Sequence, residues 1–290
     1  MKPAPFTYVA PRSAEEAQAL LAQYGDEARV LAGGQSLMPL IVMRMARPAF
    51  LIDLNRCGDL FYLRSDGDWI ACGAMTRQAD AEKSELVRSA CPILADVLTY
   101  VGHPTNRNRG TVGGTLAHAD PAAELPGLAL ALGAEFVVEG PAGRRVIRAE
   151  DFFIDSLTTS MNTGEMLREV RFPKTTSATR SAFVERGVRR ADIAIAGVAA
   201  HLELANDGSC KTASVVAIGA GPTPTRLVSV ERVLRGAPLT EESIRDAAES
   251  AGNDVDPPND LQATSEYRRK LLPVLTARAL RKAVGLEASA

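Results

Sequence analysis

Alternating apolar and polar positions predict a β-α-β unit in the first 55 residues. Ser13 and Glu16 have the spacing of a capping box, and Gly25 is a stop signal for the helix that follows the cap. The expected elements are, in order, a helix at 17–24, a strand at 29–32, a glycine-rich turn at 33–36, a short helix from Pro39 to Arg44 and a strand at 50–54.

Residues 56–175 mix hairpin signals with helical ones. Asp120 is expected to be the N-cap of an apolar helix, with Pro121 at its first helical position. The elements expected here are a hairpin of 60–63 and 69–72 around Asp66-Gly67, helical residues 85–101 broken at Pro92, a loop rich in Asn, Arg and Gly at 102–114, a helix at 120–132, a hairpin of 135–138 and 145–148, and a strand at 167–172.

A polar segment rich in Thr and Ser, at 173–181, is the best linker candidate in the chain. The elements expected after it are strands at 181–186, 198–204 and 213–218, followed by helices at 227–234, 241–251 and 266–284, the last kinked or split at Pro273. The pattern therefore predicts an α+β protein with subdomains at 1–55 and 56–175 and an α+β C-terminal domain at 180–290 that holds a three-stranded sheet.

Composition narrows the class of protein. Of the 290 residues, 46% are hydrophobic and 23% are charged, which is ordinary for a globular chain. A net charge of -2 gives no electrostatic reason to expect a nucleic-acid partner. No run of about 18 apolar residues predicts a membrane span, and the N-terminus has no apolar run of signal-peptide length. We therefore expect a cytoplasmic protein.

The cysteines argue against a metal in this chain. There are four of them, none in a CxxC pair and none with a histidine at metal-ligand spacing, at positions 57, 72, 91 and 210. Buried thiols in a reducing compartment are the ordinary reading of this pattern. We expect neither a metal ion nor an iron–sulfur cluster held by this chain.

The first candidate binding segment is the glycine-rich loop between the first two predicted strands. Paired glycines let a backbone approach a bulky anion, and the exposed amides of such a loop attract phosphate. The alternative is a tight turn with no ligand. The candidate residues are Leu31, Ala32, Gly33, Gly34, Gln35, Ser36 and Leu37.

A second glycine-rich loop has the same character and two threonine hydroxyls. Its candidate residues are Thr111, Val112, Gly113, Gly114 and Thr115. Arg107 and Arg109 precede it and could add positive charge for a diphosphate, or else lie on a solvated surface. Neither loop has the spacing of a Rossmann or P-loop motif.

The segment that follows, at 116–126, places three polar residues among small apolar ones. His118 has a suitable pKa for proton transfer, but a purely structural role fits it equally well. Asp120 and Glu124 are four residues apart around a helix start and can share a face. One interpretation is that Asp120 caps the helix and Glu124 is an exposed acidic side chain. The other is that both contact the sugar or ring part of a dinucleotide.

These segments resemble the FAD-binding medium subunits of the xanthine dehydrogenase and carbon monoxide dehydrogenase family. The resemblance rests on AGGQSL at 32–37 and NRGTVGGTLAHADPAAELP at 108–126, and extends to RPAFLIDL at 47–54, SAFVERGVRRADIAIAG at 181–197 and EYRRKLLPVLTARAL at 266–280. It implies two FAD-binding subdomains of the vanillyl-alcohol-oxidase type, with both glycine-rich loops on the FAD diphosphate.

The same resemblance implies further cofactor contacts, at Val101, Gly102, Asp120, Glu124 and Leu167. Glu124 stands where Asp is more usual in the family. Some members carry a lysine near the flavin in the segment that matches 183–186, where this chain has Val184 and Glu185, and certain members cover the ring with a tyrosine near the position of Ile193. The chain also lacks the cysteine-bearing insert of the 4-hydroxybenzoyl-CoA reductase branch.

The resemblance implies a divided chemistry. A large partner subunit holds molybdopterin and oxidises the substrate, a small partner holds two [2Fe-2S] clusters, and the FAD subunit passes electrons to a terminal acceptor, in a heterotrimer or its dimer. No residue is predicted to be an acid–base catalyst, because the cofactor supplies the chemistry. Two alternatives stay open: a free-standing flavin oxidoreductase of the same fold, and an assembly module that has lost flavin.

Overall fold

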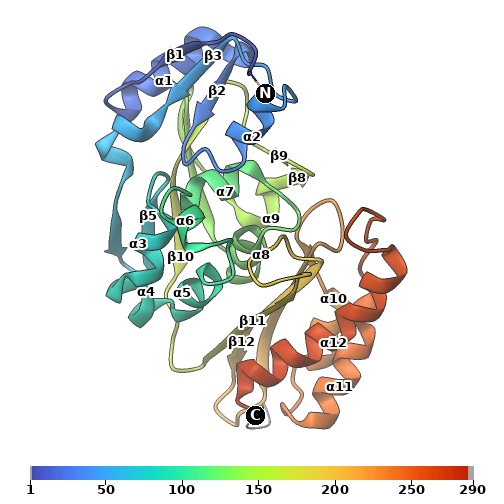
Figure 1. The fold of residues 1–290 in the computed structure, drawn as a ribbon. Helices are drawn as coiled ribbons and strands as arrows, with labels where there is room; N and C mark the ends of the chain where they lie inside the picture. The colour runs from blue at the N-terminus through green and yellow to red at the C-terminus, as the bar shows by residue number, and fades with distance from the viewer. Residues whose placement is uncertain (1, 287–290) are drawn as a thin grey trace.

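The computed structural model describes residues 2–286, and its main sheets follow one another along the length of the molecule (Figure 1). The N-terminal sheet is parallel, with strand order β1-β3-β2. Its elements are β1 (Thr7–Val9), α1 (Ala14–Tyr24), β2 (Ala28–Leu31), α2 (Leu37–Val42) and β3 (Phe50–Asp53). The predicted β-α-β unit is confirmed, and β1 is an additional strand that the sequence pattern did not indicate.

The central sheet is antiparallel, with strand order β4-β5-β10-β6-β7. Its strands are β4 (Leu63–Asp66), β5 (Trp69–Gly73), β6 (Glu135–Gly140), β7 (Gly143–Arg148) and β10 (Met166–Pro173), while β8 (Phe153–Asp155) and β9 (Thr158–Thr159) form a small separate ribbon. The helices between these strands are α3 (Gln78–Lys83), α4 (Glu85–Ala90), α5 (Pro92–Leu98), α6 (Pro104–Arg107), α7 (Val112–His118), α8 (Glu124–Leu132) and α9 (Ala149–Phe152).

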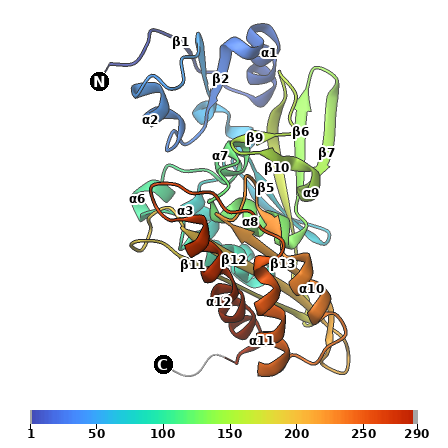
Figure 2. The same cartoon turned by 90° about the vertical axis from the view of Figure 1, so that its right-hand side faces the viewer.

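The C-terminal sheet has strand order β11-β12-β13-β14 and carries three helices (Figure 2). The bounds are β11 (Thr179–Arg186), β12 (Ala196–Leu204), β13 (Cys210–Ile218), β14 (Thr225–Arg226), α10 (Val228–Leu234), α11 (Glu241–Glu249) and α12 (Ser265–Val284). The three expected strands and three helices are present, and the two-residue β14 adds a fourth strand. Single 3-10 turns lie at Gly25–Glu27, Leu54–Arg56, Gly58–Leu60 and Ser250–Gly252.

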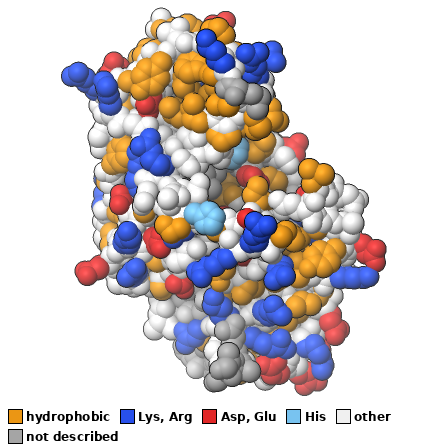
Figure 3. Space-filling view, in the orientation of Figure 1, with side chains coloured by type: hydrophobic (Ala, Val, Ile, Leu, Met, Phe, Trp, Pro, Cys, Tyr) orange, Lys and Arg blue, Asp and Glu red, His pale blue; other side chains and the backbone are white. Residues whose placement is uncertain are grey.

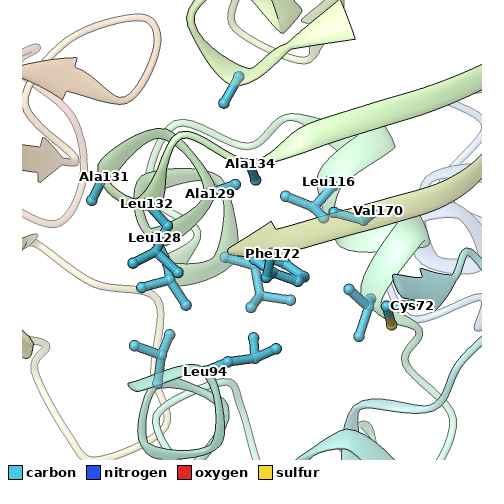
Figure 4. Packing of buried hydrophobic residues seen from close by; sticks show 14 of the residues in the cluster. Cys72, Leu94, Leu116, Leu128, Ala129, Ala131, Leu132, Ala134, Val170 and Phe172 are labelled. Carbon is cyan, nitrogen blue, oxygen red and sulfur yellow. The ribbon is translucent and has the colours of Figure 1, made fainter. Parts of the chain in front are cut away.

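The largest hydrophobic core lies between the central sheet and the helices on one of its faces. Leu94 of α5, Leu116 of α7 and Leu128 of α8 are buried with Val170 and Phe172 of β10 (Figure 4). Burying each such side chain stabilises the fold by about 1.5–3 kcal/mol. The same cluster takes in five residues of the C-terminal sheet and the loop within it, namely Phe183, Ala194, Ala199, Val216 and Ile218. One core therefore runs from the central sheet into the C-terminal sheet.

Two predicted elements are wrong in their bounds. The first strand of the early hairpin is β4 at 63–66 rather than 60–63, because Leu60 ends a 3-10 turn and its carbonyl accepts from the N–H of Met75. The apolar helix begins at Glu124 rather than at Pro121. Asp120 caps a separate turn instead, since its side chain accepts from the N–H of Ala122 and its carbonyl from that of Ala123.

Two further expectations are corrected. The segment 102–114 is not all loop, because it contains α6 and the first turn of α7. Helix α12 runs through Pro273 without being split. Its packing on β11 and β12 holds the helix together although the proline lacks the N–H that the helical ladder needs. Within the described residues, no helix combines the length and the apolar character required to cross a bilayer.

Candidate functional site

Both glycine-rich loops line one cleft, of about 560 Å³. The first loop contributes Ala32, Gly33, Gly34, Gln35, Ser36 and Leu37, and the second contributes Gly110, Thr111, Gly114 and Thr115. His118, Leu157 and Met161 also line it. The space-filling view shows this face of the molecule hollowed below the N-terminal sheet, with hydrophobic side chains gathered above the hollow (Figure 3). Loops 80 residues apart in sequence thus form one site of a size usual for ligand pockets.

The two loops touch backbone to backbone at Gly33. A Cβ there would lie 2.8 Å from the Cα of Gly110 and would also collide with the carbonyl of Arg109. Gly34 has a φ of +74°, a left-handed backbone conformation that residues other than glycine rarely adopt. The paired glycines are therefore needed for the shape of the cleft itself, before any ligand is considered.

The first loop presents a run of unused amide donors to the cleft. Among the described residues, the backbone N–H groups of Gly33, Gly34, Gln35 and Ser36 have no hydrogen-bond partner. Successive amides in such a turn form a concave anion-binding surface. The short helix α2 begins directly after them and adds the positive end of its dipole. These four donors fit the diphosphate of a dinucleotide.

The second loop uses its amides differently from what the sequence suggested. The N–H groups of Val112 and Gly113 donate to the carbonyls of Thr76 and Ala74, and that of Gly114 donates to Oγ1 of Thr111 at 3.0 Å. A Cβ on Gly113 would lie 2.6 Å from the Cα of Ala74. Gly113 therefore leaves room for Ala74, the residue that follows β5. Thr111, Gly114 and Thr115 line the cleft.

A half-buried polar network ties the two loops together, and sequence reasoning missed it. Asn55 donates to the carbonyl of Ala32 at 3.0 Å and accepts from Arg77 at 2.6 Å, and Arg77 also donates to the carbonyl of Arg109. Asp53 accepts hydrogen bonds from Asn55. The only sequence signal was a polar residue placed directly after a buried strand.

Electrostatics around this network favour an ionised Asp53. Burial raises the pKa of Asp53, but hydrogen bonds from Tyr8 (2.6 Å) and Asn55 outweigh it and leave that pKa below its usual value. Burial also lowers the pKa of the Arg77 guanidinium, which remains charged because the ordinary value is so high. The network therefore carries one fixed negative and one fixed positive charge between the loops.

Arg107 is not available to a diphosphate, contrary to one reading of the sequence. Its side chain is 9% exposed and forms an ion pair with Glu82, with 2.7 Å between Nε and Oε2. The same guanidinium donates to the carbonyls of Val101 and Gly102. Arg109 is exposed next to Gly110 of the cleft wall, and within residues 2–286 its side chain forms no ion pair. Gln35 is braced by Asn106, and Thr115 by Gln78.

Several predicted contacts do not line the cleft between the loops. Leu31 ends β2, Val112 and Leu167 are buried in the protein interior, and Val101 and Gly102 lie beside Arg107. Asp120 is half-buried in its turn. Cofactor contact at these positions stays a prediction. It would require that the ligand extend beyond the cleft between the two loops.

Glu124 is a buried acid at the first turn of α8. It is 7% exposed, and no other described residue donates a hydrogen bond to its side chain. Burial, with a smaller contribution from the charge of Asp120, raises the pKa of Glu124 to about 7. A buried acid with a raised pKa is a candidate for a functional role.

The comparison with known families decides the identity. Residues 4–175 match the FAD binding domain in molybdopterin dehydrogenase, and residues 181–283 match the CO dehydrogenase flavoprotein C-terminal domain. This chain belongs to the FAD-binding subunits of the molybdenum hydroxylases. The family resemblance stated from the sequence is confirmed, as is the predicted two-part FAD-binding fold.

Relatives of this FAD subunit match it along its length. Subunit alpha of the 6-hydroxypseudooxynicotine dehydrogenase complex of Paenarthrobacter nicotinovorans is 38% identical over 98% of this chain and 96% of its own. The structure of carbon monoxide dehydrogenase from Hydrogenophaga pseudoflava, lacking the Mo-pyranopterin moiety of the molybdenum cofactor, superposes with a TM-score of 0.95 at 36% identity, covering 99% of this chain and 100% of that one. Quinoline 2-oxidoreductase from Pseudomonas putida 86 gives a TM-score of 0.92 at 34% identity, covering 98% and 99%.

These matches show the chain to be a subunit of an oxidoreductase with FAD as its cofactor. Its four cysteines are buried and unpaired. Burial raises the pKa of the thiols of Cys57 and Cys91 to about 11, so neither offers a thiolate at neutral pH. In complexes like carbon monoxide dehydrogenase, molybdopterin and iron–sulfur clusters belong to other subunits.

Proposed function

We propose that this FAD subunit receives electrons from the [2Fe-2S] clusters of a small partner subunit and passes them to a terminal acceptor. A large partner subunit, which holds molybdopterin, would oxidise the substrate. The observation that carries the proposal is the cleft, which the second loop lines together with four residues of the first loop whose amides are not used within the described chain. Relatives named as medium chains or as subunits of dehydrogenase complexes support the division of labour.

The residues of this chain would bind and orient the cofactor rather than react. Gly33, Gly34, Gln35 and Ser36 would donate their amides to the FAD diphosphate, and Arg109 would add positive charge. Thr111, Gly114 and Thr115 would support it from the opposite wall. When bound, the flavin supplies the ability to accept electrons singly and release them in pairs. Preformed donors cost little reorganisation when the charge arrives.

The assembly we propose is a heterotrimer of the large, medium and small subunits, or its dimer. The compartment we propose is the cytoplasm, where four free thiols would stay reduced. No feature of the chain itself selects the substrate of the complex, because the proposal assigns substrate oxidation to the large subunit.

An absorbance spectrum of the purified chain, before and after addition of FAD, tests the cofactor. Flavin bands that persist through gel filtration, with FAD released on denaturation, are the expected result. Reduction of that flavin by the partner subunits and substrate, but not by substrate alone, would support the electron-transfer role. Reduction by substrate in the isolated chain would favour a free-standing oxidoreductase, and a folded, colourless chain both alone and with its partners would favour the assembly module.

A further inference from the structure

The side chain of Arg268 is a cation buried inside the C-terminal domain. It belongs to α12, is 2% exposed, and is the largest of the fully buried side chains in the described chain. Its Nε is buried without a hydrogen-bond partner within residues 2–286. Burying a charge is costly, and an apolar side chain of similar volume often packs in its place with no loss of stability. Packing alone therefore does not account for an arginine at this position.

Arg268 joins two chain segments at one end of the C-terminal sheet. Its Nη1 donates to the carbonyl of Ile195, just before β12, and at 2.9 Å to the carbonyl of Gly219, just after β13. Gly219 has a φ of +65°, and a Cβ there would lie 2.5 Å from the carbonyl oxygen of Ile195. Nη2 of Arg268 forms an ion pair with Asp260 at 2.6 Å. The guanidinium thus fixes the backbone at the point where the chain leaves β13.

The turn after β13 reaches across to the FAD-binding region. The N–H of Gly219 donates to the carbonyl of Pro121 at 2.8 Å, and the carbonyl of Pro222 accepts from Oγ of Ser156 at 3.2 Å. Pro121 lies in the turn before α8, and Ser156 lies between β8 and β9. One short turn of the region matched as the C-terminal domain therefore holds two separate segments of the region matched as the FAD binding domain.

Those two segments meet each other through strained backbone at the wall of the cleft. The N–H of Leu157 donates to the carbonyl of Ala119 at 3.0 Å, and these two residues have φ values of +56° and +54°. Residues other than glycine adopt this left-handed conformation at an energetic cost, and they keep it only where the surrounding contacts impose it. Leu157 and His118, the residue before Ala119, both line the cleft. The strained contact therefore shapes part of the cleft wall.

We propose that Arg268 is a positioning residue of the cleft, which acts through the turn at 219–222 on the contact between Ala119 and Leu157. The proposal rests on the proposed function, in which this cleft binds FAD. With Arg268 in place, the turn holds the two segments in their strained arrangement before FAD arrives. Binding of FAD then does not have to supply the free energy of ordering them. Arg268 thus contributes to FAD affinity from outside the cleft.

Arg268→Met tests the proposal, because methionine fills much of the same space and donates no hydrogen bond. In the FAD-free chain, we expect amide hydrogen exchange around Leu157 to become about tenfold faster, which should exceed any change at the centre of β13. The dissociation constant of FAD, measured by titration well below the thermal midpoints of both proteins, should rise about tenfold. Arg268→Lys keeps the charge and three donors, so it should show both effects to a smaller degree.

Arg269→Met is the matched control. Arg269 is the next residue of α12, and it likewise pairs with an acid, Asp256, and donates to a backbone carbonyl, but its side chain is exposed. The same substitution at this position should leave both the exchange around Leu157 and the FAD affinity as in the wild type.

Ser156→Ala tests the other end of the connection. It removes the hydrogen bond to Pro222 at an exposed position, and it should raise the dissociation constant of FAD about threefold. In the double variant with Arg268→Met, the two increases should not multiply, because both substitutions act on the same turn.

Several outcomes would overturn the inference. Wild-type exchange around Leu157 or wild-type FAD affinity in R268M would show that Arg268 does not position the cleft. Equally faster exchange throughout R268M would reduce Arg268 to a stabilising core residue, and multiplying effects of R268M and S156A would show that they act separately. A wild-type chain that binds no FAD would refute the proposed function, while exchange in the FAD-free chain still decides whether Arg268 fixes the contact at Leu157. Should R268M fail to fold, R268K and S156A decide by the same two measurements.

Discussion

At the residue scale, the cleft depends on close approach between two backbones more than on any single side chain. Gly33 lies against Arg109 and Gly110, and Asn55 with Arg77 joins the same two loops by hydrogen bonds. The geometry of the four free amides follows from these contacts. Substitutions that separate the two loops should therefore reduce FAD binding even where the substituted residue does not contact the cofactor.

Gly33→Ala tests the backbone contact. The added Cβ meets main-chain atoms, which cannot rotate away, so we expect a loss of stability of about 2–4 kcal/mol and loss of bound FAD. Urea unfolding and flavin absorbance measure the two effects. Gly58→Ala is the control, because nothing lies within 4 Å of a Cβ at that position. Full FAD content in G33A would contradict the account of the cleft.

Asn55→Ala tests the polar network. It removes the donor to Ala32 and takes one hydrogen-bond partner each from Asp53 and Arg77, which keep Tyr8 and the carbonyl of Arg109, so the cost should be about 1–3 kcal/mol. FAD affinity, measured by titration of the FAD-free chain, should fall as well. An unchanged affinity together with reduced stability would limit Asn55 to a structural role.

At the element scale, long apolar stretches and turn residues were predictable, and elements held by distant partners were not. The helices at 14–24, 85–98 and 265–284 carry their own capping and periodicity signals, and the hairpin around Gly140–Gly143 has its own turn. Helix α7 includes two glycines and has a weak local signal. It forms because Ala74 and Thr76 accept its first N–H groups, a contact that no local pattern reveals.

The site was predictable to the same degree. Both loops could be identified from their glycines, since the pattern is local. The hydrogen bond from Arg77 to Asn55 and the ion pair of Arg107 with Glu82 both join residues far apart in sequence. Such contacts depend on the packing of whole elements, which a single sequence does not display.

Pro273 in α12 offers a test of an element held by packing. Proline inside a helix lacks one hydrogen bond and crowds the preceding turn, at a cost of roughly 3 kcal/mol. Pro273→Ala should therefore raise the free energy of unfolding by about 1–3 kcal/mol, since some ring contacts are lost. Chemical denaturation would measure this change in unfolding free energy. Lys270→Ala, at an exposed position of the same helix, is the reference. A destabilised P273A would mean that the packing contacts of the proline ring contribute more stability than the missing helical hydrogen bond costs.

At the scale of the whole molecule, the largest core crosses the boundary between the two family regions, although the C-terminal region also has a core of its own. Phe183, Val216 and Ile218 belong to the same buried cluster as the helices of the central sheet. Cutting the chain between 175 and 180 would expose those faces to water. The division into domains at 1–55, 56–175 and 180–290 stays a prediction, and the continuous core favours joint folding of the last two.

Calorimetry of the full chain tests this. A single cooperative unfolding transition is expected for residues 56–290, and a fragment ending at 178 should aggregate or lack fixed tertiary structure because its share of the cluster is uncovered. Two well-separated transitions, or a stable monomeric fragment, would contradict it.

The contact between Gly127 and Ile218 also constrains how these subunits can diverge. A larger residue at 127 is tolerable only if 218 becomes smaller at the same time, so the two positions must change together. A chimera that joins the first 175 residues of this chain to the C-terminal region of a relative would inherit a mismatch wherever that pair differs. Exchanging one half alone therefore requires that the residues at 127 and 218 still fit each other, although each half matches a family model by itself.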